Sequence, residues 1–455
     1  MPSGAHFVKT FLKKTADCAF NKYILLISSV LGWPGRTKGS GRRYENRVCS
    51  VVLAKMSQRS RIESSILSAI FRLPIPTRRA ISKHLSLSHV TVGKALQSME
   101  SDGTITFADM VSATGSGRPS EVFAVRNEAF YGIGVYLEPS RAIAVLMDAG
   151  KNTLGEWHRN IENRSWDRHN VQELLRDVAR WAYDNAGEHV DSNSIASVGL
   201  AVPGFVDTMH ARWTAGLQFG DFADVDVTAV LSDVTDADVS LEDTSRSLTH
   251  MELMTGRASV MSDYFIVVNM GIGLGAGIVV DGEVLLGHGG IVGEIGHIPL
   301  GNNSNRCSCG NLGCTETMLS ASGIRSEFAR RLQQGVRSSI RPSGPENYPT
   351  IRDILDSAER GDHFTVSTLA ELGSMMGDLL DIVLKSHTPC PVVLAGEGSL
   401  LAEHLVPSMQ QRLAMRMLPE MQRHYSISVQ EYTGTNEALG AALLGVSRML
   451  ASSAS

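Results

Sequence analysis

The stretch that decides the fold runs Gly293-Glu294-Ile295-Gly296-His297 and continues, ten residues later, as Cys307-Ser308-Cys309-Gly310-Asn311-Leu312-Gly313-Cys314-Thr315-Glu316. Thiolates and imidazole are ligands that zinc prefers, and four of them complete a tetrahedral structural site. A disulfide or a loop of unrelated cysteines is the alternative, but half of the chain's 6 cysteines fall in this loop. The sequence therefore predicts one structural zinc ion, bound by His297, Cys307, Cys309 and Cys314.

The same run resembles the signature of the ROK family, which comprises repressors, open reading frames and sugar kinases. The resemblance extends from roughly Ser57 to the C-terminus. It implies an α/β chain with a two-lobed, actin-like ATPase fold of the ribonuclease H-like type. Some members are sugar kinases, and others carry an N-terminal winged helix-turn-helix and act as sugar-responsive transcription regulators.

Length and composition limit the number of domains and the class of protein. A chain of 455 residues predicts about three domains. The net charge of −5 argues against a uniformly basic nucleic-acid binder but permits a basic module. Few cysteines and the lack of an apolar run of about 20 residues favour a cytoplasmic protein without a membrane partner. We expect a basic extension at 1–55, a winged helix-turn-helix at 56–126, and two lobes at 127–260 and 261–455.

The first 55 residues hold ten Lys or Arg against Asp17 and Glu45. A short apolar stretch at 23–31 follows basic residues, but Lys22 crowds it and no clear cleavage site follows, so it makes a poor signal peptide. We interpret Met56 as the natural start and the preceding segment as upstream sequence, with a disordered basic tail as the alternative.

Three helices are predicted in the front module. Apolar residues at helical spacing mark 60–71, Thr77 is a plausible N-cap for 78–85, and Ser88 opens 89–101. Two helices joined by a short turn form a helix-turn-helix, whose second helix enters the major groove of DNA. Two strands around a Gly-rich wing, 115–119, follow. The alternative is a protein-binding winged helix.

The outward positions of this module are the predicted DNA contacts. Side chains near the start of the third helix face base edges and phosphates, and basic residues of the second helix suit the phosphate backbone. The predicted DNA-binding residues are Arg78, Arg79, Lys83, Ser88, His89, Thr91, Lys94 and, at the wing, Arg118. Gly93 stands where related helices often carry Ser.

The rear module alternates strands and helices, which indicates an α/β fold. Strands are predicted at 131–137, 142–147, 195–202, 265–269, 278–280, 284–286 and 392–395, with helices at 170–186 and 436–451. In sugar kinases of this fold the first phosphate loop reads Asp-X-Gly-Gly-Thr-Lys. Here Gly134 takes the place of the Asp, bulky residues replace the glycines, and Glu138 and Pro139 add a repelling charge and remove an amide donor. This loop should not bind ATP, although the second loop, 271–277, looks intact.

Resemblance to the family implies a sugar pocket. The residues implied to contact sugar hydroxyls are Glu242, Asp243, Glu294, His297 and Glu316, of which Asp243 matches the general base of the kinases. Glu242 replaces a usual Asn, and Gly216 stands where another Asn is common, which leaves the identity of the ligand open.

The leading interpretation is a sugar-responsive transcription regulator, most simply a repressor, that binds operator DNA as a homodimer or homotetramer and has no catalytic residue in use. An ATP-dependent sugar kinase with Asp243 as general base is the alternative. A zinc-bearing binding protein that has lost both activities is the third possibility.

Overall fold

The computed structural model describes residues 61–111, 119–162, 166–216, 218–220, 224–256, 258–300 and 304–452. The basic extension predicted at 1–55 and Arg118 at the predicted wing lie outside these residues. Within the described ranges, no helix is both long enough and apolar enough to cross a bilayer.

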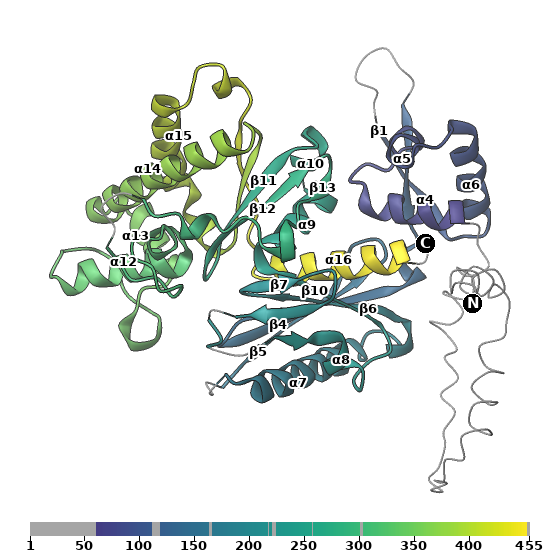
Figure 1. Cartoon of the computed structure of the whole chain (residues 1–455), viewed down its shortest axis with the longest axis horizontal. Helices are drawn as coiled ribbons and strands as arrows, with labels where there is room; N and C mark the ends of the chain where they lie inside the picture. The colour runs from purple at the N-terminus through teal and green to yellow at the C-terminus, as the bar shows by residue number, and fades with distance from the viewer. Residues whose placement is uncertain are drawn as a thin grey trace, which may run out of the picture. The chain divides into compact units, whose positions relative to one another are not determined.

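The front module consists of three helices and a two-stranded antiparallel sheet, the order expected of a winged helix-turn-helix (Figure 1). The elements are α4 (Arg61–Arg72), α5 (Arg78–Leu85), α6 (His89–Ser101), β1 (Ile105–Val111) and β2 (Ser120–Val125). As predicted, the Thr77 side chain accepts a hydrogen bond from the backbone of Ala80 and caps α5, and the Ser88 side chain accepts one from Thr91 and caps α6.

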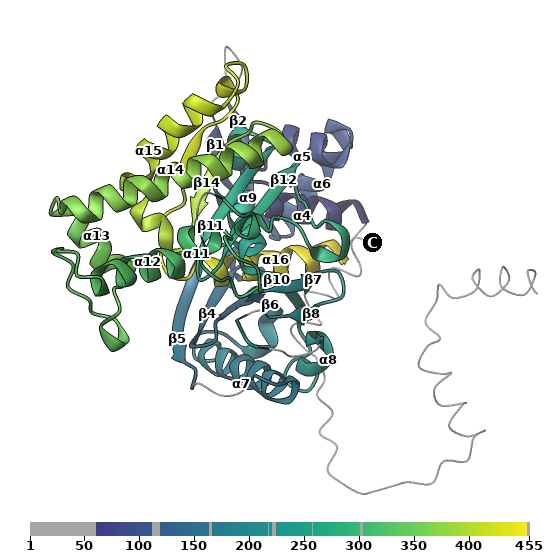
Figure 2. The same ribbon diagram turned by 60° about the vertical axis from the view of Figure 1, so that its left-hand side comes forward.

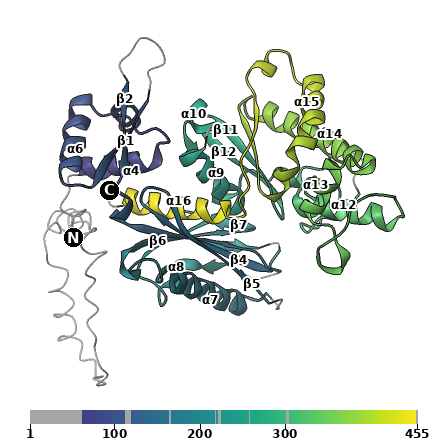
Figure 3. The same ribbon diagram turned by 180° about the vertical axis from the view of Figure 1, so that it is seen from behind.

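The first lobe is built on a five-stranded sheet of order β10-β6-β3-β4-β5. Strands β3, β4 and β5 are antiparallel, whereas β6 and β10 run parallel to β3. Helices α7 and α8 cover one face (Figure 3). The elements are β3 (Tyr131–Leu137), β4 (Arg141–Asp148), β5 (Thr153–Asn160), α7 (Arg168–Ala186), β6 (Ile195–Val202), β7 (Phe205–Asp207), β8 (Arg212–Ala215), β9 (Val225–Asp226), α8 (Val227–Leu231) and β10 (Asp238–Asp243).

The second lobe repeats this strand order as β13-β12-β11-β14-β15, with three antiparallel strands followed by two parallel ones. Helices α14 and α15 pack side by side on it (Figure 2). The elements are α9 (Thr244–Thr255), α10 (Ala258–Met261), β11 (Phe265–Met270), β12 (Leu274–Val280), β13 (Glu283–Val284), α11 (Glu316–Leu319), α12 (Ala321–Gln333), α13 (Ile351–Glu359), α14 (His363–Ser386), β14 (Val392–Ala395), α15 (Ala402–Arg416) and β15 (Ile427–Val429). The repeated order agrees with the predicted actin-like, two-lobed architecture.

Helix α16, Asn436–Ser452, lies on the face of the first sheet opposite α7 (Figure 1). A Cβ atom on Gly134 would lie 1.9 Å from the carbonyl oxygen of Ala438, and one on Gly199 would lie 1.9 Å from that of Ala441. Since real atoms do not approach so closely, both positions require glycine and let helix and sheet meet almost backbone to backbone.

The far end of α16 meets α4 of the front module, and buried side chains of both belong to one hydrophobic cluster. In this cluster the rings of Phe71 and Phe130 pack edge to face with centroids 6.2 Å apart, and Leu450 of α16 is fully buried. The front module therefore shares its core with the first lobe.

Candidate functional site

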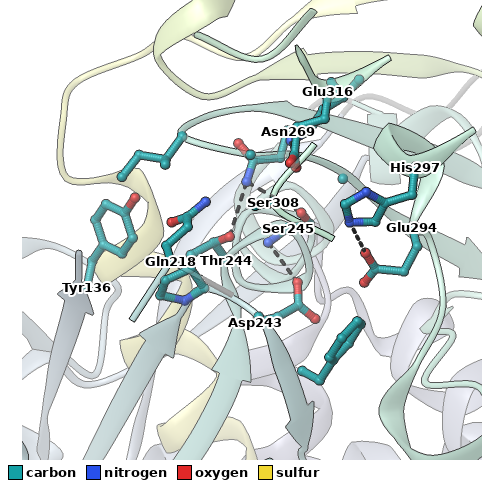
Figure 4. Close-up of a pocket in the computed structure, with 17 residues that line it drawn as sticks. Tyr136, Gln218, Asp243, Thr244, Ser245, Asn269, Glu294, His297, Ser308 and Glu316 are labelled. Carbon is teal, nitrogen blue, oxygen red and sulfur yellow. Dashed lines mark hydrogen bonds and ion pairs between the residues drawn. The ribbon is translucent and has the colours of Figure 1, made fainter. Parts of the chain in front are cut away.

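A polar pocket lies between the two lobes, where β10 ends and the loops of the second lobe begin (Figure 4). Asp243 ends β10 and caps α9, since its Oδ1 accepts hydrogen bonds from the backbone N–H groups of Ser245 and Arg246 at 2.8 and 3.0 Å. The cleft is open to solvent, and its space free of atoms is about 680 Å³ when that open solvent is counted. Four of the five predicted sugar-contact residues line it: Asp243, Glu294, His297 and Glu316.

Three carboxyl groups converge on this pocket. Glu316 Oε2 accepts a hydrogen bond from the backbone N–H of Leu274 at 3.2 Å, and Glu294 Oε2 lies 3.7 Å from His297 Nε2. Burial and the neighbouring charges of Asp243 and Glu316 raise the pKa of Glu294 to about 7. A carboxyl group with that pKa can donate as well as accept hydrogen bonds near neutral pH, and sugar hydroxyls need both.

Glu242 does not line the pocket, contrary to the prediction. Its side chain is fully buried beneath Asp243. Its Oε1 accepts hydrogen bonds from Thr208 Oγ1 at 2.7 Å and from Arg246 Nε at 2.6 Å. The prediction failed because Glu242 and Asp243 are neighbours on a strand, and successive strand side chains point to opposite faces. Glu242 is therefore a buried ion-pair partner, not a direct ligand contact.

Arg246 is one of the residues of this region that sequence reasoning missed. Its side chain is 1% exposed, and Nε lies 2.8 Å from Asp243 Oδ2. The guanidinium also donates to the carbonyl oxygens of Val206, from the first lobe, and Gly290, from the second. One side chain thus joins the pocket aspartate to loops of both lobes. The only available signal was an arginine three residues after Asp243, one helical turn along α9.

The region expected to match the first phosphate loop carries bulky side chains in place of the family's glycines, as the sequence indicated. Gly134 packs against α16, so the residue that faces the pocket from β3 is Tyr136, not Gly134 (Figure 4). Beyond it, Glu138 forms two hydrogen bonds of 2.9 Å with the guanidinium of Arg141. Burial raises the pKa of the nearby Glu437 to about 7. Tyr136 therefore lines the pocket, and the buried carboxyl groups of Glu138 and Glu437 lie near it.

The second glycine-rich segment is less of a loop than the sequence indicated, because β12 already begins at Leu274. A Cβ atom on Gly275 would lie 2.4 Å from Ser245 Oγ, and one on Gly277 would lie 1.8 Å from Thr249 Oγ1. These glycines are therefore required by the close packing of α9 on β12.

The four predicted zinc ligands form one cluster whose ligand atoms all lie within 4.8 Å of one another. Cys309 Sγ lies 3.7 Å from Cys314 Sγ, and Cys307 Sγ lies 3.6 Å from His297 Nδ1. Bonds of about 2.3 Å to sulfur and about 2.0 Å to nitrogen in a tetrahedron require edges of about 3.5 to 3.8 Å. The donor set and its spacing fit one zinc ion, with His297 Nδ1 as ligand and Nε2 turned towards Glu294.

The predicted DNA-binding residues cluster on the outer surfaces of α5 and α6. Arg78, Arg79 and Lys83 of α5 are exposed, as are His89 and Lys94 of α6. Two of the residues predicted to contact bases, Ser88 and Thr91, already use their hydroxyl groups within the protein. These hydroxyls lie 2.8 Å apart, and Ser88 also caps the helix. Val90, which was not predicted, is 68% exposed on the same surface.

Comparisons with known proteins agree with this arrangement. A family model described as ROK family matches residues 143–447. The chain belongs to the ROK family. It is similar to the DNA-binding transcriptional dual regulator NagC of Escherichia coli (strain K12), with 27% identity over 350 residues, 75% of this chain and 83% of that protein. It is also similar to the glucokinase of Thermotoga maritima, with 26% identity over 274 residues, 60% of this chain and 86% of that one.

Among solved structures, a ROK family transcriptional regulator described as a homologue of the E. coli MLC protein aligns with a TM-score of 0.68 and 23% identity. The alignment covers 87% of this ROK chain and 98% of that regulator. This coverage extends beyond the residues that the ROK family model matches, so the shared fold includes the front module.

Proposed function

We propose that this ROK protein is a DNA-binding transcription regulator, of the repressor type, whose operator affinity changes when a sugar or sugar derivative binds between its lobes. The observation that carries the proposal is the presence, in one chain, of an exposed helix-turn-helix and a polar interlobe pocket. The similarity to NagC, whose name gives it a transcriptional role, supports the same assignment.

In this proposal the pocket residues Asp243, Glu294 and Glu316 bind sugar hydroxyls, and the zinc ion is structural. With Nδ1 on the metal, His297 presents Nε2 to the pocket, 3.7 Å from Glu294 Oε2. Metal binding would fix the orientation of that ring and of the loop that carries it. Zinc therefore shapes the effector site and takes no part in chemistry.

The proposal excludes phosphoryl transfer as the main function. Catalysis of that reaction depends on positioning and neutralising nucleotide phosphates. Tyr136 faces the pocket from β3, and the buried Glu138 lies nearby, paired with Arg141. A phosphate placed there would meet the ring of Tyr136, and the following Pro139 has no N–H group to donate to it. The alternative, an ATP-dependent sugar kinase, is favoured by Asp243 in the pocket and by the similarity to a glucokinase.

Helix α16 is our proposed connection between pocket and DNA. Its first turn holds the buried Glu437 beside the interlobe cleft, and its last turns share a core with α4. A ligand that favours one interlobe arrangement would shift the population of both ends of this helix together. We further propose a homodimer or homotetramer, because a helix-turn-helix reads a palindromic site with two copies.

The deciding experiment is selection of bound DNA fragments from the source genome, followed by binding measurements with a panel of sugars. A sugar that changes the affinity for a selected fragment supports the proposal. Lys94→Ala should weaken binding to the selected sequence by roughly 1–3 kcal/mol if it reads a base, whereas Arg79→Ala should weaken all sequences alike and flatten the salt dependence. Failure to enrich any fragment would contradict the proposal.

A further inference from the structure

The outward face of α6 carries an apolar residue, Val90, in its first turn. Val92, Leu96 and Met99 are buried, which fixes the inward side of the helix. Val90 and Lys94 stand four residues apart on the opposite side, and both are exposed. Val90 is 68% exposed. It therefore points directly away from the core of the module, in the first turn of the helix.

Ser88, Thr91 and one ring nitrogen of His89, all close to Val90 in the chain, have hydrogen-bonding partners. Ser88 Oγ accepts a hydrogen bond from the backbone N–H of Thr91 at 3.1 Å and lies 2.8 Å from Thr91 Oγ1. His89 Nδ1 lies 3.4 Å from Ser82 Oγ. The isopropyl group of Val90, by contrast, is exposed to solvent at the start of the helix.

Cationic groups flank this apolar tip. A Cβ atom built on Gly93 would lie 3.5 Å from the guanidinium carbon of Arg78, so Arg78 extends from α5 across the surface of α6. Lys94 lies on the other flank of the same outward stripe. In the major groove of DNA, base edges form the floor and phosphates line the edges. An apolar side chain such as Val90 therefore suits the floor, and the cationic side chains of Arg78 and Lys94 suit the phosphates.

We propose that Val90 is a specificity-determining residue that reads thymine through contact with its C5-methyl group. Thymine's methyl is the distinctive apolar group that the four standard base pairs present in the major groove. A valine cannot exchange hydrogen bonds with the other base edges, so burying it against them would leave their donors and acceptors without water or a partner. The inference rests on the proposed DNA-binding function and adds the base chemistry that α6 recognises.

The test replaces each thymine of a selected operator, one at a time, with deoxyuridine, which removes the methyl group alone. For the wild-type protein, one thymine in each half-site should lose about three- to fivefold in affinity, the ratio expected for burying one methyl-sized group. Val90→Ala should bind the unmodified operator more weakly by a similar factor and should be insensitive to uracil at that position. Val429→Ala, which truncates an equally branched exposed side chain on β15, should behave as wild type.

Equal sensitivity of wild type and Val90→Ala to every thymine-to-uracil change would overturn the inference while leaving DNA binding intact. Val90→Thr offers a second measurement that keeps the side-chain shape but adds a hydroxyl, and it should retain sensitivity to uracil at the same thymine. If no operator is enriched at all, the proposed function fails, and the assignment of Val90 fails with it.

Discussion

Arg246 Nε lies 2.8 Å from Asp243 Oδ2. The same guanidinium also pairs with Glu242, the residue that precedes Asp243. Beneath the pocket, Glu242 Oε2 lies 3.6 Å from His250 Nε2. The carboxylate that faces the pocket is thus held by a cation that also neutralises a buried acid. Arg246 therefore has two roles, to position Asp243 and to make the burial of Glu242 possible.

Replacing Arg246 with Met should destabilise the protein by roughly 3–5 kcal/mol, because it leaves the carboxylate of Glu242 buried without its cation. Unfolding in urea followed by tryptophan fluorescence measures this, since four of the 5 tryptophans, at positions 157, 166, 181 and 213, belong to the first lobe. Arg412→Met is the matched control. It breaks a partly exposed pair with Asp378 and should cost less than about 1 kcal/mol. Equal losses in the two variants would contradict a special role for Arg246.

Removing one thiolate should abolish metal binding. Cys309→Ser leaves three ligands, which cannot close the tetrahedron, so we expect about one zinc per chain in the wild type and none retained by the variant. Metal analysis of purified protein, with melting temperatures measured beside it, checks both points. Cys390→Ser changes a buried cysteine outside the cluster and should keep the metal. A wild type that is equally free of metal would contradict the predicted zinc site.

Gly93 should tolerate alanine. It lies inside α6, and the added Cβ would meet Arg78 at 3.5 Å, an ordinary van der Waals distance. Because glycine costs roughly 1 kcal/mol relative to alanine within a helix, Gly93→Ala should stabilise the front module by up to that amount. Gly103→Ala is the opposite control, since this residue has a φ of +74° and a Cβ there would lie 2.8 Å from Arg126. Thermal unfolding should therefore move in opposite directions for the two variants.

Lys151 gives the chain a defined dependence of stability on alkaline pH. Its amine donates to the carbonyl oxygen of Met254 at 3.0 Å and lies 5.3 Å from the ring centroid of Phe71. Burial lowers its pKa from 10.5 to about 8. Between these values the unfolded chain holds a proton that the folded chain has released, so stability rises with pH across this window. Below pH 8 the cost of burying the ammonium is present in full.

Relative to Lys151→Met, the wild type should gain stability by up to roughly 3 kcal/mol as the pH rises from 8 to 10.5. Denaturation midpoints at several pH values, converted to free energies, give this difference. Lys151→Arg also lacks a group that titrates in this range, so the two variants should stay parallel to each other. A wild type that runs parallel to both would show that Lys151 titrates normally.

Local sequence signals predicted much of the fold. The bounds of β3, β6, α5, α6 and β14 agree with the prediction, because apolar periodicity and the caps Thr77 and Ser88 act within a few residues. The metal cluster followed from ligand chemistry and spacing alone. The start of β12 was placed too late, because Gly275 and Gly277 look like loop residues until the side chains of α9 that press on them are known.

The pocket was only partly predictable, because its contacts join residues far apart in sequence. The burial of Glu242 depends on Thr208 from a different hairpin, 34 residues away. Likewise, the resemblance matched Gly134 to the Asp of the phosphate loop and Tyr136 to one of its glycines, but it did not indicate that α16 would cover Gly134 and leave Tyr136 lining the pocket. A single sequence does not contain the position of a helix 300 residues further along the chain.

The pocket should bind a sugar-like ligand without phosphorylating it. Asp243 and Glu316 line the site, where we propose that they accept hydrogen bonds from hydroxyl groups. A set of polar side chains gathered in a cleft is stabilised by a ligand that completes its hydrogen bonds. Turnover requires in addition that nucleotide phosphates be neutralised, whereas this chain has Tyr136 at the pocket and Glu138 beyond it. Each 1.36 kcal/mol added to the barrier is tenfold in rate, so a missing phosphate cradle should leave no measurable reaction.

We therefore expect a sugar from a panel of hexoses, pentoses and their N-acetylated or phosphorylated forms to raise the melting temperature while a coupled assay with ATP detects no ADP. Asp243→Asn should reduce the stabilisation, because it removes a charged acceptor and weakens the pair with Arg246. Asp236→Asn, an exposed residue of the same lobe outside the pocket, should leave it unchanged. Sugar-dependent ADP release that disappears in Asp243→Asn, in a variant that the sugar still stabilises, would establish a kinase in place of a regulator, because binding would then remain while the catalytic base is lost.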